Sequence, residues 1–172
     1  MKRLWLAFTT LAVVLSMSGV AGAQGNPRGK ASVEVNGSTV TVDYGRPSLK
    51  GRSVQDMLAK LPVGGFWRLG ADTSTTFTSS GDLAFGSTKV PKGTYSLWAE
   101  KASEKSWKLV FNTQHGQWGT QHNPKLDAYK VDLKESKATE PAEEVTISLA
   151  KAGMGGMITI EWGDLNLKAD FK

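Results

Sequence analysis

The sequence contains no cysteine, which excludes disulfide bonds and thiolate metal sites. After residue 23 it has no apolar run close to the length of about 20 residues that a membrane-spanning helix needs. It also lacks the Gly-x-Ser-x-Gly elbow of many serine hydrolases, and no glycine cluster joins a strand to a helix as a phosphate-binding loop does. These absences remove several large classes of enzyme and membrane protein from consideration.

The first 23 residues have the organisation of a bacterial-type signal peptide. Met1-Lys2-Arg3 is positively charged, the stretch from Leu4 to Val14 is mostly apolar, and small residues follow up to Ala21-Gly22-Ala23. This order is typical of a secretory signal that is cleaved after its last small residue. We therefore expect residues 1–23 to be removed and the mature chain to begin near Gln24, in the periplasm or outside the cell.

The mature chain carries only a small positive charge. Loss of the signal peptide leaves 19 of the 21 basic side chains against 16 acidic ones, a net charge of +3. Proteins that bind nucleic acid usually present a much more basic surface, so we expect no nucleic-acid partner. A weak positive charge in an exported protein suits anionic glycans, lipid headgroups or acidic partners.

Alternating apolar and polar residues dominate the mature chain and indicate half-buried strands. Val33 and Val35 alternate with polar residues before Asn36-Gly37, and Val40 and Val42 do so after it, which is typical of a hairpin with a two-residue turn. The same alternation recurs in eight further segments: 75–79, 83–85, 94–100, 107–112, 129–134, 145–149, 158–162 and 165–171.

One apolar and one polar face per strand predicts an all-β fold in which antiparallel sheets pack face to face. We expect a single β-sandwich domain over residues 31–172, for which a jelly-roll arrangement is one form. Residues 24–30 are expected to form a flexible N-terminal arm. The polar stretch 135–143 is expected to be a loop.

One segment follows a helical pattern instead. Val54, Met57, Leu58 and Leu61 are spaced as on one face of a helix, after Ser53 as a suitable N-cap and before a proline. We expect one short helix here, placed at an end of the β core.

Four motifs resemble a known family. They are Tyr44 to Arg52, Phe66 to Asp72, Gly93 to Leu97, and Phe111-Asn112 followed by Gln117 to Gly119. Together they resemble the exported bacterial domain-of-unknown-function family 2911, which has no assigned activity. The resemblance implies an envelope or secreted location and a compact β domain, and it supplies no catalytic residues.

Basic and aromatic residues gather in the segment between residues 44 and 72. Arginine binds carboxylate or phosphate groups through paired hydrogen bonds, and tryptophan or tyrosine can provide an apolar wall for a sugar ring. The candidate ligand-binding residues are Tyr44, Arg46, Lys50, Arg52, Trp67, Arg68 and Asp72. In the alternative interpretation Trp67 fills the core, and two of the arginines, Arg46 and Arg68, pair with Asp43, Asp56 or Asp72 to fix a long loop.

A second candidate site lies further along the chain. His115, His122 and Asp127 offer two imidazoles and a carboxylate, a set that could hold zinc or copper. Residues seven positions apart on one strand face opposite ways, so both histidines reach one metal only if this segment is a loop. The alternative is two solvated histidines, since no recognised metal-binding spacing is present.

Three functions are compatible with these patterns. The first is a non-enzymatic exported module that binds a small anionic or carbohydrate ligand, with no cofactor required. The second is a metal-dependent hydrolase that uses a divalent metal at His115 and His122. The third is a structural or partner-binding envelope protein, whose protein partner the sequence does not identify. The sequence alone does not decide whether the protein is an enzyme.

Overall fold

The computed structural model describes residues 25–172, so the expected signal peptide and Gln24 lie outside the described residues. Within this range the chain is almost entirely strand. The strands are β1 (Arg28–Val35), β2 (Ser38–Gly45), β3 (Phe66–Trp67), β4 (Thr76–Ser79), β5 (Leu83–Phe85), β6 (Thr88–Val90), β7 (Gly93–Ser103), β8 (Ser106–Asn112), β9 (Asp127–Ala152) and β10 (Gly155–Phe171). One α-helix, α1 (Val54–Ala59), and a 3-10 turn at Pro124–Leu126 complete the secondary structure. No helix of residues 25–172 has the length and apolar character needed to cross a membrane.

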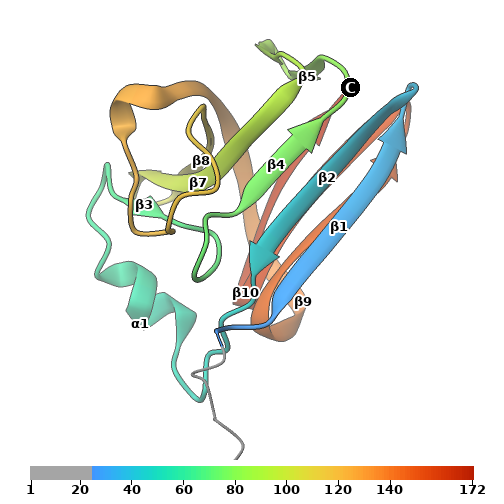
Figure 1. The fold of residues 1–172 in the computed structure, drawn as a ribbon. Helices are drawn as coiled ribbons and strands as arrows, with labels where there is room; N and C mark the ends of the chain where they lie inside the picture. The colour runs from blue at the N-terminus through green and yellow to red at the C-terminus, as the bar shows by residue number, and fades with distance from the viewer. Residues whose placement is uncertain (1–24) are drawn as a thin grey trace, which may run out of the picture.

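All strand pairs are antiparallel, and one continuous sheet runs in the order β1-β2-β4-β7-β8-β9-β10, with β3 paired to β7. The sheet curls over itself, so that the β1–β2 hairpin lies along the β9–β10 hairpin in Figure 1. Backbone hydrogen bonds from Leu49 to Glu143 (2.9 Å) and from Val145 to Pro47 (3.1 Å) close part of the seam. The all-β antiparallel fold with one short helix is thereby confirmed, as a nearly closed, barrel-like sheet.

The β1–β2 hairpin confirms the register expected from the sequence. Asn36 and Gly37 have φ angles of 51° and 78°, and Val33 lies opposite Val40 across the turn. The first strand starts earlier than expected, because Arg28 to Lys30, placed in the flexible arm above, already pair with β2.

The prediction of a loop at residues 135–143 was wrong, because this stretch lies inside the 26-residue strand β9. β9 pairs with β8 up to Leu133 and with β10 from Lys134 onwards. Register shifts next to Gly163, whose φ is +56°, bend the β9–β10 pair at this point. Most side chains of 135–143 are exposed on both faces of the strand, so the polar composition reports exposure and not a break in the sheet.

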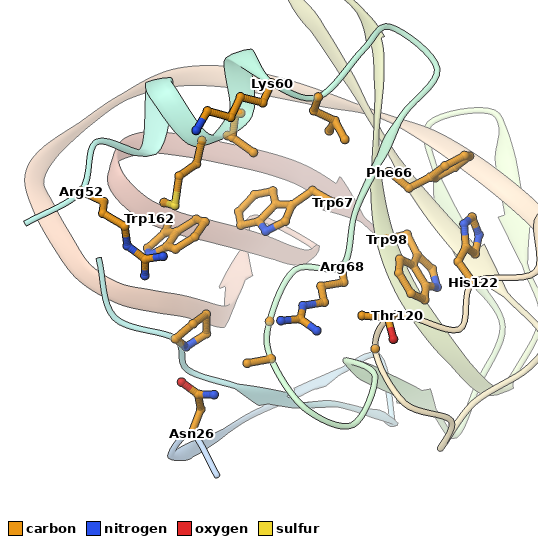
Figure 2. Close-up of a pocket in the computed structure, with 17 residues that line it drawn as sticks. Asn26, Arg52, Lys60, Phe66, Trp67, Arg68, Trp98, Thr120, His122 and Trp162 are labelled. Atoms are coloured by element: carbon orange, nitrogen blue, oxygen red, sulfur yellow. The ribbon is translucent and has the colours of Figure 1, made fainter. Parts of the chain in front are cut away.

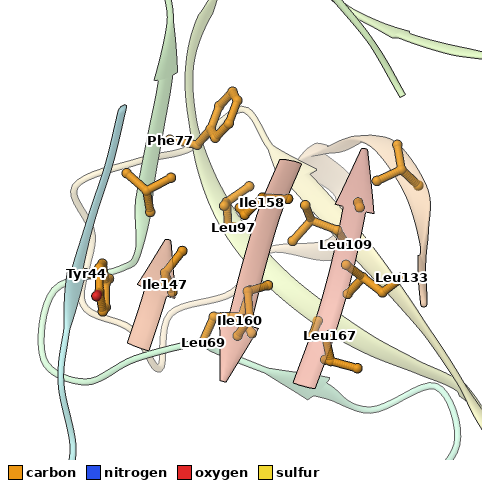
Figure 3. Close-up of a cluster of buried hydrophobic side chains, with 14 of the residues drawn as sticks. Tyr44, Leu69, Phe77, Leu97, Leu109, Leu133, Ile147, Ile158, Ile160 and Leu167 are labelled. Atoms are coloured by element: carbon orange, nitrogen blue, oxygen red, sulfur yellow. The ribbon is translucent and has the colours of Figure 1, made fainter. Parts of the chain in front are cut away.

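The core fills the interior of the curled sheet. Figure 3 shows inward-facing side chains from several strands meeting there. Its largest fully buried members include Phe77, Phe111, Phe171, Leu97 and Ile158. These residues come from the alternating segments of the sequence, although in the central strands β7 and β8 neighbours such as Ser96 and Asn112 are buried as well.

The helix α1 confirms the helical spacing and covers one end of the sheet. Ser53 caps its start by accepting a hydrogen bond from the Asp56 N–H at 3.3 Å. The buried Val54 packs on β10 at Gly163, where an added Cβ atom would lie only 2.8 Å from Val54 Cγ1. This close approach seats the helix and leaves Met57 and Leu58 half-buried at the edge of a cavity.

Candidate functional site

A cavity of about 760 Å³ lies between α1 and the end of the curled sheet. Its walls come from segments far apart in the chain: α1 and the turn after it, residues 66–71, strands β7 and β10, and the loop 119–122. Figure 2 shows the side chains that these segments direct around the cavity. A concave site with mostly apolar walls and a few polar groups is the usual form of a small-molecule site.

Indole rings form one wall of the cavity. Trp67 of β3 and Trp162 of β10 stack with their ring centroids 5.6 Å apart and their planes 12° apart. Trp98 of β7 and Phe66 of β3 contribute further aromatic surface. The three indoles are buried, Phe66 is half-buried, and all four rings are carried by strands, so the wall is formed before any ligand arrives.

Three cations, Arg52, Lys60 and Arg68, line the cavity, and no aspartate or glutamate of residues 25–172 does. Arg52 donates to the backbone carbonyl oxygens of Leu49 (2.8 Å) and Ser48 (2.9 Å), which orient its guanidinium without neutralising it. In the described part of the chain, none of the three cations forms an ion pair with a carboxylate. The cavity is therefore electropositive.

His122 stands at the opposite end of the cavity from Arg52 (Figure 2). Its Nε2 lies 2.8 Å from Asp127 Oδ1, and its ring stacks on Trp98 at a centroid distance of 4.4 Å. Asn112 donates to the same carboxylate oxygen at 2.7 Å, so Asp127 is held by two partners. Since the side chains of His122 and Asp127 are only 10% and 4% exposed, the imidazole has a fixed orientation.

Asp72 holds two of the lining residues of the cavity in place. Its carboxylate accepts a hydrogen bond from the Asn26 N–H at 2.7 Å, and its carbonyl oxygen accepts one from the Gly119 N–H, also at 2.7 Å. Both Asn26 and Gly119 line the cavity. The φ angle of Asp72 is +60°, a left-handed conformation that aspartate tolerates better than most residues. This conformation lets one residue hold two walls.

The structure divides the seven candidate ligand-binding residues. Arg52, Trp67 and Arg68 meet at the cavity, and Asp72 positions two of its walls. The remaining three line no part of the cavity: Tyr44, buried in the core; Arg46, in an ion pair with Glu144 at 3.1 Å; and Lys50, exposed at a turn. The alternative pairing of Arg46 or Arg68 with Asp43, Asp56 or Asp72 does not occur among the described residues.

The three candidate metal ligands do not form one site. His122 and Asp127 are paired at the cavity, whereas His115 is exposed on the loop before it. Residues 25–172 contain no group of three or more histidine, aspartate or glutamate side chains that could hold a metal ion. His122 therefore lines the cavity, with its imidazole held by the carboxylate of Asp127.

Sequence reasoning missed several cavity residues, among them Lys60, Trp98 and Trp162. Trp98 and Trp162 occupy buried positions of strands, where their pattern is that of ordinary core residues. Nothing in strand alternation separates a tryptophan that fills the core from one whose face borders a cavity. Lys60 follows the helix directly. Its position next to Leu61, the last residue of the apolar helical pattern, was the only feature of the sequence that pointed to the cavity.

The fold and the site define a class: a small antiparallel β domain with an aromatic, electropositive cavity under a short helix. The chain belongs to the family described as protein of unknown function (DUF2911), whose model matches residues 26–171. This match confirms the resemblance seen in the sequence motifs. No curated protein and no solved structure is detectably similar to the chain.

Proposed function

We propose that this protein is an exported binding protein whose cavity beside α1 holds a small organic anion. The ligand combines a carboxylate or phosphate group with an apolar or ring-shaped part, and an acidic sugar meets both requirements. The observation that carries the proposal is the convergence of Arg52, Lys60 and Arg68 on one cavity that no carboxylate of residues 25–172 lines.

The charge arrangement supports an anionic ligand for a physical reason. Like charges that line one cavity repel one another, and an anion placed between them relieves that repulsion. Guanidinium groups also bind carboxylate or phosphate through two parallel hydrogen bonds. Arg68 is free to do so, because its side chain has no hydrogen-bond or ion-pair partner among residues 25–172.

The apolar walls support a ligand with a ring-shaped body. Met57 and Leu58 of α1 border the cavity together with the stacked indoles of Trp67 and Trp162. Aromatic faces and aliphatic side chains bind the less polar face of a sugar or a small ring by burying its surface. A bare inorganic anion would leave most of this surface unused.

The export part of the proposal rests on the N-terminal sequence. A basic start, an apolar stretch and a small-residue cleavage site predict a mature N-terminus near Gln24. Mass spectrometry of protein recovered from the periplasm or the medium is expected to give this N-terminus. A chain that keeps Met1 and stays in the cytoplasm would refute export.

The binding part is tested by isothermal titration calorimetry on the purified exported protein. The probes are glucuronate, citrate and inorganic phosphate, with glucose as the neutral comparison. We expect an anion to bind and Arg68→Ala to weaken its binding roughly ten- to a hundredfold, the usual effect of losing a hydrogen bond to a charged group.

Arg46→Ala is the matched control, because it removes the same charge from an arginine that pairs with Glu144 outside the cavity. We expect the affinity of this variant to equal that of the wild type. Equal losses in the two variants, or glucose binding as tightly as glucuronate, would contradict the proposal. If no probe binds, a structural or partner-binding role explains the protein better.

A further inference from the structure

His122 uses one ring nitrogen to bind a carboxylate and leaves the other without a partner. Its Nε2 lies 2.8 Å from Asp127 Oδ1, and Asn112 donates to the same oxygen at 2.7 Å. Since a carboxylate can only accept hydrogen bonds, the neutral imidazole carries its proton on Nε2. The lone pair of the imidazole is therefore on Nδ1, to which no group of residues 25–172 donates a hydrogen bond.

The unpartnered nitrogen is accessible. In the described part of the chain, the side-chain nitrogen and oxygen atoms that are both inaccessible and unpartnered are Trp162 Nε1 and Asn166 Oδ1, and His122 Nδ1 is not one of them. The imidazole is otherwise enclosed, because Trp98 stacks on it at a centroid distance of 4.4 Å and Phe66 meets it in a T-shaped arrangement at 4.3 Å. All three rings line the cavity, so the open side of the imidazole faces the cavity.

The hydrogen-bonding character of this nitrogen complements that of the cations. The side chains of Arg52, Lys60 and Arg68 carry donors and no acceptor, whereas Nδ1 of the neutral His122 accepts and cannot donate. In Figure 2 Arg68 lies between Arg52 and His122, so donors and acceptor follow one another along the cavity. A ligand that consisted of an acidic group alone would engage the cations and leave this acceptor unused.

We propose that His122 Nδ1 accepts a hydrogen bond from a hydroxyl group of the ligand while the cations hold the ligand's acidic group. This inference rests on the proposed function and narrows the ligand class from an organic anion to a hydroxylated one, such as a sugar acid. A hydroxyl suits this place better than an ammonium group, because the cations of the same cavity would repel a positive donor. The carboxylate of Asp127 keeps the proton on Nε2 and so keeps Nδ1 an acceptor.

The first test follows the histidine ring nitrogens by NMR in ¹⁵N-labelled exported protein without a histidine tag. The chain has two histidines, and His115 is exposed on a loop, so its signals serve as an internal reference. At about pH 8, where histidines are usually neutral, the free protein should show His122 protonated at Nε2. Glucuronate should then move the Nδ1 signal of His122 to lower frequency, as acceptance of a hydrogen bond does. Cyclohexanecarboxylate, a ring acid without hydroxyl groups, should leave it in place.

The second test removes the acceptor. His122→Phe keeps an aromatic ring to stack on Trp98 and has no ring nitrogen. Calorimetry gives the affinities of the wild type and the variant for glucuronate and for cyclohexanecarboxylate. We expect the ratio of the two affinities to change about five- to tenfold in favour of cyclohexanecarboxylate, the usual effect of losing one hydrogen bond. Because each ratio is taken within one protein, a general loss of affinity cancels.

His115→Phe is the matched control, because it removes the exposed imidazole outside the cavity, and its ratio should equal that of the wild type. The inference is overturned, while the proposed function stands, if bound glucuronate leaves the His122 Nδ1 signal unmoved or if His122→Phe keeps the wild-type ratio. A free protein with His122 protonated at Nδ1 overturns it as well. If His122→Phe does not fold, the NMR result on the wild type decides. If the wild type binds neither acid, the proposed function fails and the inference fails with it.

Discussion

Two concave regions of this molecule are rich in basic side chains, and they differ in how many of those side chains pair with an acid. The cavity beside α1 has three cations and no acidic residue among its lining residues in the described chain. A second hollow of about 470 Å³ lies between the β5–β6 turn and strands β8, β9 and β10. We call it the lysine groove, and its four lysines are Lys108, Lys130, Lys134 and Lys168.

The lysines of the groove are mostly neutralised by acids. Lys108 pairs with Asp132 at 2.8 Å, Lys134 with Asp170 at 3.5 Å, and Lys130 with Glu100 at 2.7 Å. The hydrogen bond to Asp132 raises the pKa of Lys108, as expected for an ammonium beside a carboxylate. Counting basic residues therefore does not separate the two regions, whereas asking which of them lack an acid does.

The largest effect should come from lifting α1 off the sheet, which opens the cavity and leaves the groove intact. Gly163→Ala adds a Cβ atom against Val54 at a position with φ +56°. We expect it to lower the free energy of unfolding in urea by about 2–5 kcal/mol, the sum of backbone strain and overpacking.

Gly153→Ala is the control for that substitution. Gly153 also has φ +56°, but nothing lies within 4 Å of its added Cβ atom. It should therefore lose only the backbone part, about 1–2 kcal/mol. Equal destabilisation by the two substitutions would show that the contact between α1 and β10 is not a tight one.

Reversing one charge sharpens the comparison between the two regions. Arg68→Glu places a carboxylate among the remaining cations of the cavity, and we expect anion affinity in calorimetry to fall at least about a hundredfold, or about 2.7 kcal/mol. Lys168→Glu makes the same change of charge in the groove and should leave that affinity unaltered. A comparable loss in both variants would point to long-range attraction in place of a local site.

The role of the acids in the groove can be tested by removing the partners of its lysines. Asp132→Asn together with Asp170→Asn removes the partners of Lys108 and Lys134. These exposed pairs contribute little, so stability should change by less than about 1 kcal/mol. NMR titration with inorganic phosphate should then detect weak binding in the groove that the wild type lacks. If the wild-type groove already binds phosphate, pairing of its lysines with acids does not prevent anion binding.

The smallest effect concerns the loop that holds Arg52. Hydrogen bonds from Ser48 and the Lys50 N–H, with a smaller contribution from the nearby charge of Arg52, lower the pKa of Glu143 below the ordinary value of 4.5 for a glutamate. A carboxyl group with a lowered pKa in the folded state stabilises the fold above its unfolded pKa and loses this contribution as pH falls through the folded value. The stability measured by urea unfolding should therefore fall slightly more below pH 4.5 in the wild type than in Ser48→Ala. Parallel pH profiles would rule out this contribution.

Local features of the fold could be predicted from the sequence. The Asn36-Gly37 turn sets the register of its hairpin, and Ser53 with the apolar spacing after it defines the helix, because neighbouring residues decide both. The stretch 135–143 was misjudged because a strand exposed on both faces shows no alternation.

The site was only partly predictable, for a related reason. Arg52 and Arg68 stood out as basic residues near an aromatic one, but the partners that complete their cavity lie far along the chain. Trp162 reaches Trp67 only because β10 passes under α1, and that arrangement depends on tertiary packing. Arg46 shows the opposite outcome, since it matched the same local pattern and the curled sheet brought Glu144 to it.

The seam that closes the sheet has a consequence for the order of folding. Ser48 contacts Glu143 across 95 residues of chain, and the N-terminal segment meets the C-terminal hairpin along this line. Contacts of such large sequence separation form slowly, because the chain must lose much entropy before they stabilise it. The cavity needs both sides of the seam, so it should be among the last features to appear after synthesis. If the cavity binds a ligand as we propose, binding reports that the chain has finished folding, and a chain that ends before β10 lacks the cavity.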